Sequence, residues 1–184
     1  MFSSKLMWRQ LPELHALATQ LPEYAGLPVE ILLERLFGGP VYVWMSRGDK
    51  VRQAVSMWRA LQTRSWRDGH GGADKGPEEL HYRFEGIEHL VRSLEAEDRS
   101  WDEFFAGHGI APLKISYEDD LERDRGRTVN AVLERVGVTA PAGWHAAEPL
   151  KRQADDLSEQ WVATYHRDCA LRGVQPGATA VAVR

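Results

Sequence analysis

Blocks of apolar residues along this chain alternate with segments in which apolar and polar positions follow a helical period. The apolar block at residues 41–45, VYVWM, is continuous and rich in β-branched and aromatic residues, which is typical of a parallel strand buried on both faces. Residues 2–8 and 110–120 each predict a further strand. Strands that alternate with helices indicate an α/β fold with a mainly parallel sheet, and we expect residues 41–45 to be its central strand.

The predicted helices carry apolar residues three or four positions apart. Residues 10–39 form short helical pieces that prolines interrupt and a Gly-Gly pair ends. A helix from about Asp49 to Trp66 follows the central strand, and we expect it to pack on the sheet. Longer helical patterns cover residues 78–109, 125–138 and 153–173. On the helix after the central strand, one apolar stripe is expected to be buried, and it consists of Val51, Ala54, Val55, Trp58 and Leu61.

Length and composition are those of one globular domain. The 184 residues are 43% hydrophobic, which is enough to bury a core. We therefore expect a single domain over residues 1–184, with a loose tail at residues 173–184. The sequence has no run of about 18 apolar residues and no apolar signal-peptide core, so neither a membrane span nor export is expected.

Charge and cysteine content narrow the classes of partner. Lys and Arg total 23 against 27 Asp and Glu, so a nucleic-acid-binding surface is not expected and any anion site must be local. Cys169 is the only cysteine, which excludes an internal disulfide and fits the reducing cytoplasm. The seven histidines have no paired metal-binding spacing, and we expect no metal site.

The turn after the central strand is the place where we expect chemistry. Arg47 ends the strand and Asp49 begins the following helix, where free backbone amides and the helix dipole favour an anion. The carboxyl ends of parallel strands are also where open α/β sheets bind ligands. Arg47 is suited to donate two bonds to a phosphate, and Asp49 is suited to cap the helix. Farther along the helix, polar residues follow the helical period beside the apolar stripe. They either line the side of the helix that faces the ligand or form an ordinary solvated face, and they are Arg52, Ser56, Arg59 and Thr63.

Several segments, in the same order along nearly the whole chain, resemble the Stf0 family of bacterial sulfotransferases. They are YVWMSRGDKVRQAVSMWRALQT at residues 42–63, FSSKLMWRQL at 2–11, HGIAPLKISYEDD at 108–120, TVNAVLERVGV at 128–138 and QADDLSEQWV at 153–162. The resemblance implies a P-loop-like sulfotransferase fold, with a three-layer arrangement of helices on both faces of a mainly parallel sheet. It further implies transfer of a sulfuryl group from 3'-phosphoadenylyl sulfate (PAPS) to a hydroxyl of a trehalose-like carbohydrate.

The resemblance also implies roles for three residues. In the wider sulfotransferase pattern, an Arg after the central strand and a Ser on the next helix hold the 3'-phosphate of the donor, and Arg47 and Ser56 match these positions. Tyr117 matches a segment near the adenine, although a tyrosine at a strand end also serves simple packing. Ser46 departs from the pattern, in which this turn often has two successive basic residues.

Gln62 and Trp66 are the candidates for contacts with the acceptor sugar. They lie one turn apart at the end of the helix, beside the glycine-rich segment 68–77, which in this interpretation closes over the acceptor. An ordinary helix end followed by a solvated loop explains the same pattern.

The sequence has no recognisable half-site for the 5'-phosphosulfate of the donor. Neither a Walker-type P-loop nor a Ser/Gly-rich run follows the first predicted strand, and the catalytic carboxylate of the family has no counterpart. We therefore expect no catalytic residue in this chain, a start that is internal to a longer gene, and exposed apolar faces around residues 41–45. The predicted fold is accordingly incomplete at its N-terminal end.

Two other function classes stay open. A non-catalytic nucleotide-binding module, or a degenerate sulfotransferase, would bind adenosine 3',5'-bisphosphate without turnover. A small kinase of P-loop type would prefer ATP, but the chain lacks a Walker-type Lys and a Mg-binding Ser/Thr. The sequence leaves open which sugar is the acceptor and whether the chain forms a homodimer.

Overall fold

The structure is a computed structural model of the whole chain, and it describes residues 2–63, 80–141, 143–144 and 156–177. In these residues the sheet consists of two short parallel strands, β1 (Val43–Ser46) and β2 (Leu113–Ser116). A parallel pair needs a long crossover connection, and helices α3 (Lys50–Thr63) and α4 (Phe84–Gly107) lie within it.

Further helices precede and follow the strand pair. Helices α1 (Leu11–Ala18) and α2 (Val29–Phe37) come before β1, whereas α5 (Arg125–Arg135) and α6 (Asp156–Arg172) follow β2. Gly38 ends α2 in the left-handed conformation, with φ of 64°, which a glycine adopts without a steric penalty. None of the described helices combines the length and the apolar character needed to cross a bilayer.

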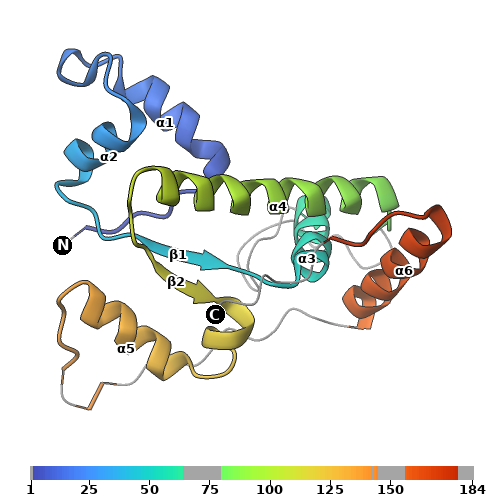
Figure 1. Cartoon of the computed structure of the whole chain (residues 1–184). Helices are drawn as coiled ribbons and strands as arrows, with labels where there is room; N and C mark the ends of the chain where they lie inside the picture. Colours follow the sequence, from blue (N-terminus) through green and yellow to red (C-terminus); the bar gives the residue numbers. More distant parts are fainter. Residues whose placement is uncertain (1, 64–79, 142, 145–155, 178–184) are drawn as a thin grey trace.

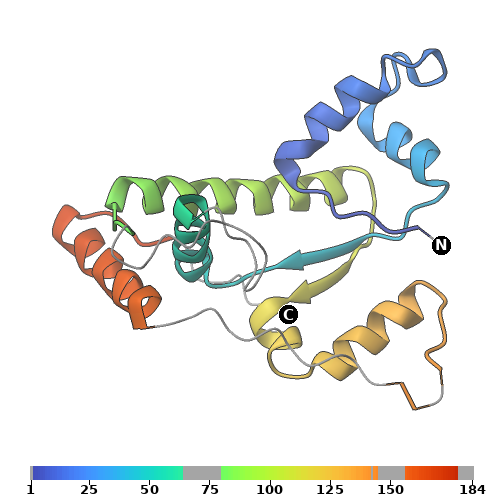
Figure 2. The same cartoon turned by 180° about the vertical axis from the view of Figure 1, so that it is seen from behind.

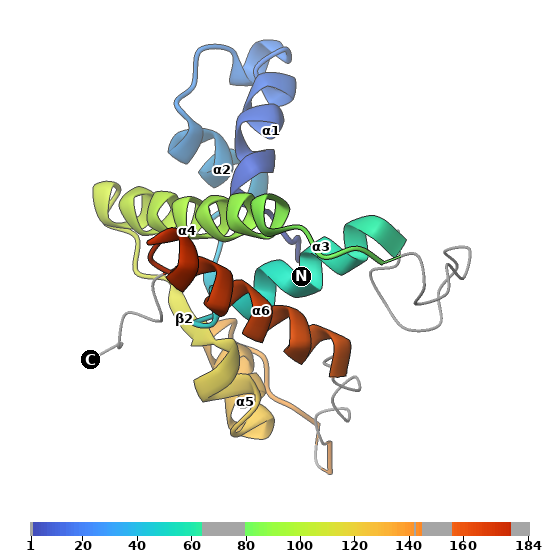
Figure 3. The ribbon, with the colours of Figure 1, turned by 90° about the vertical axis from the view of Figure 1, so that its right-hand side faces the viewer.

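The helices surround the strand pair on different sides. Figure 1, and Figure 2 from behind, show α4 along one side of β1 and β2 and α5 on the other. The strands run toward the end of the molecule where α3 lies, and Figure 3 shows α6 beside α3 and below α4. The chain is therefore a helix-rich α/β protein with a small parallel sheet.

One hydrophobic cluster joins α3, α4 and α6. Val55 of α3, Ile87 of α4 and Tyr165 of α6 are fully buried in it. The ring of Tyr165 stacks on that of Phe84, with ring centroids 5.3 Å apart. Burial of this many apolar side chains supplies most of the force that holds the three helices together.

A second, largely aromatic cluster joins α4 to the strand pair. Phe105 of α4 lies 5.6 Å from Tyr42 and 6.0 Å from Trp44, measured between ring centroids. Trp8 packs edge-on against Trp101 in the same cluster, at 5.0 Å. The side chains of Tyr42 and Trp44 thus fix β1 beneath α4, and with it the direction in which the strand ends.

The prediction of a central strand buried on both faces is wrong for residues 41–45. In the two-stranded sheet formed by the described residues β1 is an edge strand, and among these residues only the side of Tyr42 and Trp44 is packed. Val43 and Met45, which point the other way, are 38% and 58% exposed. A continuous apolar run shows that both faces are hydrophobic, but it does not show that both have a packing partner. The exposed apolar face expected around this strand is present.

Three further predictions are wrong in detail. Residues 2–8 form no strand, because neither β1 nor β2 pairs with them and a 3-10 turn begins at Trp8. The helix after β1 packs on α4 and α6 instead of on the strands, and its Leu61 is 47% exposed. Residues 80–83 are not helical, and α4 begins only at Phe84.

Candidate functional site

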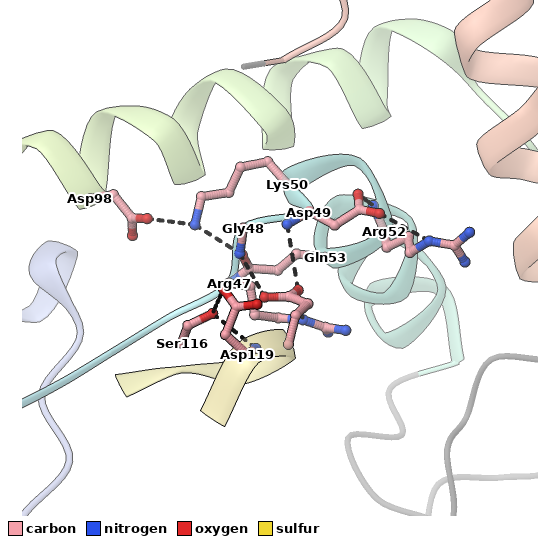
Figure 4. A network of polar contacts seen from close by, with 10 residues as sticks. Arg47, Gly48, Asp49, Lys50, Arg52, Gln53, Asp98, Ser116 and Asp119 are labelled. Atoms are coloured by element: carbon pink, nitrogen blue, oxygen red, sulfur yellow. Dashed lines mark hydrogen bonds and ion pairs between the residues drawn. The ribbon is translucent and has the colours of Figure 1, made fainter. Parts of the chain in front are cut away.

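The carboxyl ends of β1 and β2 lie side by side and lead into two charged turns. Ser46 and Ser116, the last residues of the strands, are partners in the register. β1 continues through residues 47–49 into α3, and β2 continues into a π-helical turn at Tyr117–Leu121. Figure 4 shows the polar side chains that meet there. The site therefore joins segments 70 residues apart in the sequence.

Asp49 caps α3, as the sequence predicted. Its Oδ1 atom accepts a 2.9 Å hydrogen bond from the backbone amide of Arg52, and its Oδ2 atom lies 2.9 Å from Nε of the same residue. An aspartate at this position satisfies an amide that has no partner within the helix, and its charge is favourable at the positive end of the helix dipole. The start of α3 is thus fixed by its own N-cap.

The guanidinium of Arg47 is held along one edge. Its central carbon lies 4.2 Å from the centre of the Tyr117 ring, and its Nε atom lies 3.6 Å from Oε1 of Glu118. The Nε atom is buried and makes no hydrogen bond with the described residues, so its contact with Glu118 is an ion pair, whereas the side chain as a whole is 28% exposed. Within the residues that the structure describes, the two terminal nitrogens make no hydrogen bond. The outer edge of the guanidinium is therefore available to a ligand.

Glu118 occupies the anion position at the start of α3, and sequence reasoning missed it. Its Oε2 atom accepts a 2.8 Å hydrogen bond from the amide of Gly48, and its Oε1 atom accepts a 3.4 Å bond from the amide of Asp49. The amides expected to attract a phosphate are thus bound to a carboxylate of the same chain. The available signal was an acidic residue just after a neighbouring strand, because the ends of parallel strands meet at one edge.

Burial and hydrogen bonding act in opposite directions on the Glu118 carboxyl group. Burial alone would raise the pKa of Glu118, but hydrogen bonds from backbone amides, including those of Gly48 and Asp49, and the charge of Arg47 outweigh it. The pKa of Glu118 therefore lies below its ordinary value of 4.5. The group is ionised at neutral pH and places a fixed negative charge beside Arg47.

Tyr117 is half-buried and lies next to Arg47. One face of its ring is covered by the guanidinium, in a cation–π contact. The structure thus gives Tyr117 a partner within the protein, and a contact of its ring with an adenine stays a prediction.

Ser56 lies exposed on α3. Its hydroxyl makes no hydrogen bond with the described part of the chain. Two neighbours on the same face contact α6, since Arg52 forms an exposed pair with Glu159 and Arg59 donates to the hydroxyl of Ser158. The polar flank of α3 is therefore partly a contact between two helices, and Ser56 is an accessible member of it.

Gln62 binds protein backbone. Its Nε2 atom donates to the carbonyl of His81 at 3.1 Å, and its Oε1 atom accepts from the amide of His81 at 2.8 Å. This pair of bonds attaches the segment before α4 to the end of α3. Trp66, the other residue predicted to contact the acceptor, lies outside the described residues.

Lys50 is a second residue of this region to which the sequence assigned no role. It is the first residue of α3 and is only 6% exposed, yet it carries an ammonium group. Its Nζ atom lies 2.5 Å from Oδ2 of Asp98 on α4 and 3.4 Å from the side-chain oxygen of Gln53 (Figure 4). This ion pair attaches the start of α3 to the middle of α4, so it fixes the turn that carries Arg47.

A hollow lies at the opposite end of the strands and contains none of the predicted site residues. It has a volume of about 440 Å³ and is lined by residues at the end of α4 and the start of β2, together with Arg135. Its charged groups already have partners: Lys114 pairs with Asp102 at 2.9 Å, and Arg135 donates to the carbonyl of Ala111 at 2.6 Å. The described residues contain no group of His, Cys, Asp or Glu that could hold a metal ion.

The fold and this site define a helix-rich α/β protein with a charged turn where two parallel strands end. The family model described as Stf0 sulphotransferase matches residues 1–168, and the chain belongs to this family. The resemblance noted in the sequence is thereby confirmed.

Curated relatives of the chain are bacterial enzymes. It is 34% identical over 174 residues to the trehalose 2-sulfotransferase of Mycobacterium tuberculosis strain Erdman, a match that covers 94% of this chain and 63% of the relative. It is also 34% identical over 175 residues to the trehalose 2-sulfotransferase of Mycolicibacterium smegmatis, with the same two coverages. The chain thus spans 63% of the length of the curated relatives it matches.

Proposed function

We propose that this chain carries the part of a sulfotransferase that binds the 3'-phosphate of PAPS, and that the enzyme transfers the sulfuryl group to a hydroxyl of a trehalose-like carbohydrate. Membership of the Stf0 family and the names of the two relatives support this proposal. The reaction breaks the bond between sulfur and the bridging oxygen of the donor and forms a bond to the acceptor oxygen. It leaves adenosine 3',5'-bisphosphate and releases the hydroxyl proton to a base.

The observation that carries the proposal is the state of Arg47. Its guanidinium lies with one face over the ring of Tyr117 and with its Nε edge toward Glu118, while its terminal nitrogens make no hydrogen bond within the described residues. A guanidinium of this kind binds two oxygens of a phosphate in a fork, and little side-chain entropy is lost when it does so, because the group is already oriented. The exposed hydroxyl of Ser56 is the proposed second donor to the same phosphate.

The acceptor side of the proposal rests on Gln62 and Trp66. Gln62 would have to exchange its bonds to the backbone of His81 in order to bind a sugar hydroxyl directly. Trp66 is proposed to offer its ring as a surface for the sugar. We propose neither a catalytic residue within this chain nor a metal ion.

Isothermal titration calorimetry with two nucleotides tests the proposal. Adenosine 3',5'-bisphosphate and 5'-AMP differ only in the 3'-phosphate, so the ratio of their dissociation constants isolates its contribution. We expect the bisphosphate to bind more tightly than AMP, and Arg47→Ala to weaken bisphosphate binding by about ten- to a hundredfold with AMP binding unchanged. Arg47→Lys should restore only part of the affinity, because an ammonium group cannot form the fork.

A matched control is Arg99→Ala, which removes an exposed arginine from α4. It should leave both dissociation constants unchanged. Equal binding of the two nucleotides by the wild-type protein would remove the 3'-phosphate from the proposal, and an unaltered constant in Arg47→Ala would remove Arg47. Transfer of labelled sulfate to trehalose by the chain as given would contradict the proposal that this chain contains no catalytic residue.

A further inference from the structure

We propose that Glu118 is a positioning residue for the binding of a nucleotide 3'-phosphate by Arg47. In this proposal Glu118 has two effects: it keeps anions off the backbone amides at the start of α3, and it orients the guanidinium. The inference rests on the proposed function of the Arg47 site, and it deepens that function by naming the group that decides where the phosphate can bind.

The first effect concerns the amides of the turn after β1. Gly48 and Asp49 both donate to Glu118, at 2.8 Å and 3.4 Å, and each uses a different carboxylate oxygen. An open helix N-terminus offers such amides and the positive end of its dipole to any anion. Here the position holds a negative charge from the protein itself. A phosphate that approaches the strand ends is therefore directed away from the amides and toward a side chain.

The second effect concerns the direction of the Arg47 guanidinium. Oε1 of Glu118 lies 3.6 Å from the buried Nε atom, on the inner edge of the group, and the two form an ion pair without a hydrogen bond. Tyr117, the residue before Glu118, lies against the guanidinium, with its ring centre 4.2 Å from the central carbon. The inner edge of the guanidinium thus faces the Glu118 carboxylate, and one of its faces lies on the Tyr117 ring. The outer edge, which has the two terminal nitrogens, is left for a ligand. Two adjacent residues of the turn after β2 thus determine how Arg47 presents its donors.

No other acid of this turn performs the same task. Asp120 accepts a 2.7 Å hydrogen bond from the amide of Ser116, and Asp119 interacts with the Ser116 hydroxyl. Both aspartates therefore stabilise the turn itself, whereas Glu118 reaches across to the turn after β1. Asp119 is exposed and adjacent to Glu118, so Asp119→Asn removes an equal charge from the same turn without touching Arg47.

The opposite interpretation makes a prediction of opposite sign. If Glu118 were an internal competitor that the phosphate must displace from Arg47, its neutralisation would strengthen binding of the bisphosphate. If Glu118 positions Arg47, its neutralisation weakens binding, because the two backbone amides now use different carboxylate oxygens and Gln replaces one of these oxygens by an NH2 group, which faces an N–H donor.

The test measures nucleotide preference in the wild-type protein, in Glu118→Gln and in Asp119→Asn. Calorimetry gives the dissociation constants of adenosine 3',5'-bisphosphate and 5'-AMP for each. We expect the preference for the bisphosphate to fall by about five- to thirtyfold in Glu118→Gln and to stay at the wild-type value in Asp119→Asn. A purely structural role of Glu118 would lower stability and leave the preference unchanged. An unchanged preference, or tighter binding of the bisphosphate, would overturn the proposal.

Nuclear magnetic resonance without nucleotide separates this inference from the proposed function. In Glu118→Gln the Gly48 amide should lose its protection from hydrogen exchange, and the Nε–H signal of Arg47, identified with Arg47→Lys, should shift. If the wild-type protein shows no preference for the bisphosphate while these signals change, the proposed function fails and the orientation of Arg47 by Glu118 stands. If the signals do not change, the inference fails. Should Glu118→Gln not fold, Glu118→Asp, which keeps the charge but is one methylene shorter, is expected to give the same losses.

Discussion

The guanidinium of Arg47 lies over the ring of Tyr117, 4.2 Å from its centre, although 70 residues separate the two in the sequence. The contact exists because β1 and β2 are paired in parallel, so that the residues after their last partners, Ser46 and Ser116, come together. It ties the proposed phosphate-binding side chain to the strand that follows α4. The donors of Arg47 are therefore oriented by the sheet rather than by the turn alone.

The ring, and not the hydroxyl, of Tyr117 is expected to matter for Arg47. Tyr117→Phe keeps the π face under the guanidinium and should leave the affinity for adenosine 3',5'-bisphosphate within about twofold of wild type. Tyr117→Leu removes a contact worth about 0.5–1 kcal/mol, which corresponds to a loss of about two- to fivefold. Calorimetry on the two variants makes the comparison, and an equal loss in both would show that the hydroxyl carries the effect.

Acid should remove the stability that Glu118 contributes. Because the pKa of Glu118 is lowered on folding, its contribution is present above the ordinary value of 4.5 and is lost as the pH falls through the lower folded value. Glu118→Gln should therefore have a lower free energy of unfolding than wild type at about pH 7, and the difference should shrink at about pH 3.5. Urea unfolding of both proteins at the two pH values measures it, and a difference independent of pH would contradict this account.

The ion pair between Lys50 and Asp98 should respond unequally to loss of its two partners. Asp98→Ala leaves the buried ammonium group of Lys50 without its carboxylate and is expected to cost about 2–4 kcal/mol. Lys50→Met removes the charge but keeps the volume of the side chain, and Asp98 stays partly solvated, so we expect a loss of less than about 1.5 kcal/mol. Urea unfolding gives both values, and a larger loss in Lys50→Met would contradict the burial argument.

Gly86 should not tolerate a methyl group. A Cβ atom at this position of α4 would lie 2.7 Å from two carbons of the Trp58 ring, so the indole or the helix would have to move. We expect Gly86→Ala to destabilise the protein by about 1–2 kcal/mol, because an overpacking cost of about 1–3 kcal/mol exceeds the gain of up to about 1 kcal/mol in helix propensity.

The control for this substitution lies on the same helix. Gly107→Ala adds a Cβ atom that meets nothing within 4 Å. It should leave the midpoint of thermal unfolding unchanged or raise it slightly. A similar drop in both variants would show that the contact with Trp58 is not the cause.

Local features of the site were predictable because they depend on neighbours in the sequence. Asp49 stands directly before a helical pattern, and an aspartate at that position predicts an N-cap. In the structure it caps the amide of Arg52. Arg47 follows directly on an apolar run, so its place at a strand end could be inferred without knowledge of any other element. The family resemblance added Ser56 and Tyr117, and the structure brings Tyr117 into contact with Arg47.

The partners of these residues could not be predicted in the same way. Glu118 and Asp98 each lie next to other acids in the sequence, and nothing local separates Glu118 from Asp119 and Asp120. Only the parallel pairing of the strands selects the acid that reaches Gly48, and only the crossing of α3 and α4 places a carboxylate beside Lys50. For the same reason the apolar run at β1 predicts burial on both faces, although Val43 and Met45 are exposed.

The sequence by itself determined that a strand ends near residue 46 and a helix follows it, that the start of α3 is capped and that a cation lies at the end of β1, since each depends on residue type and on spacings of a few residues. Tertiary structure alone decided that Glu118 accepts hydrogen bonds from the amides at the start of α3 and that Lys50 is buried against Asp98. It also decided that Met45 is exposed while Trp44 is packed. The physical reason is that ion pairing and burial depend on distances between elements far apart in the chain, which only packing of those elements determines.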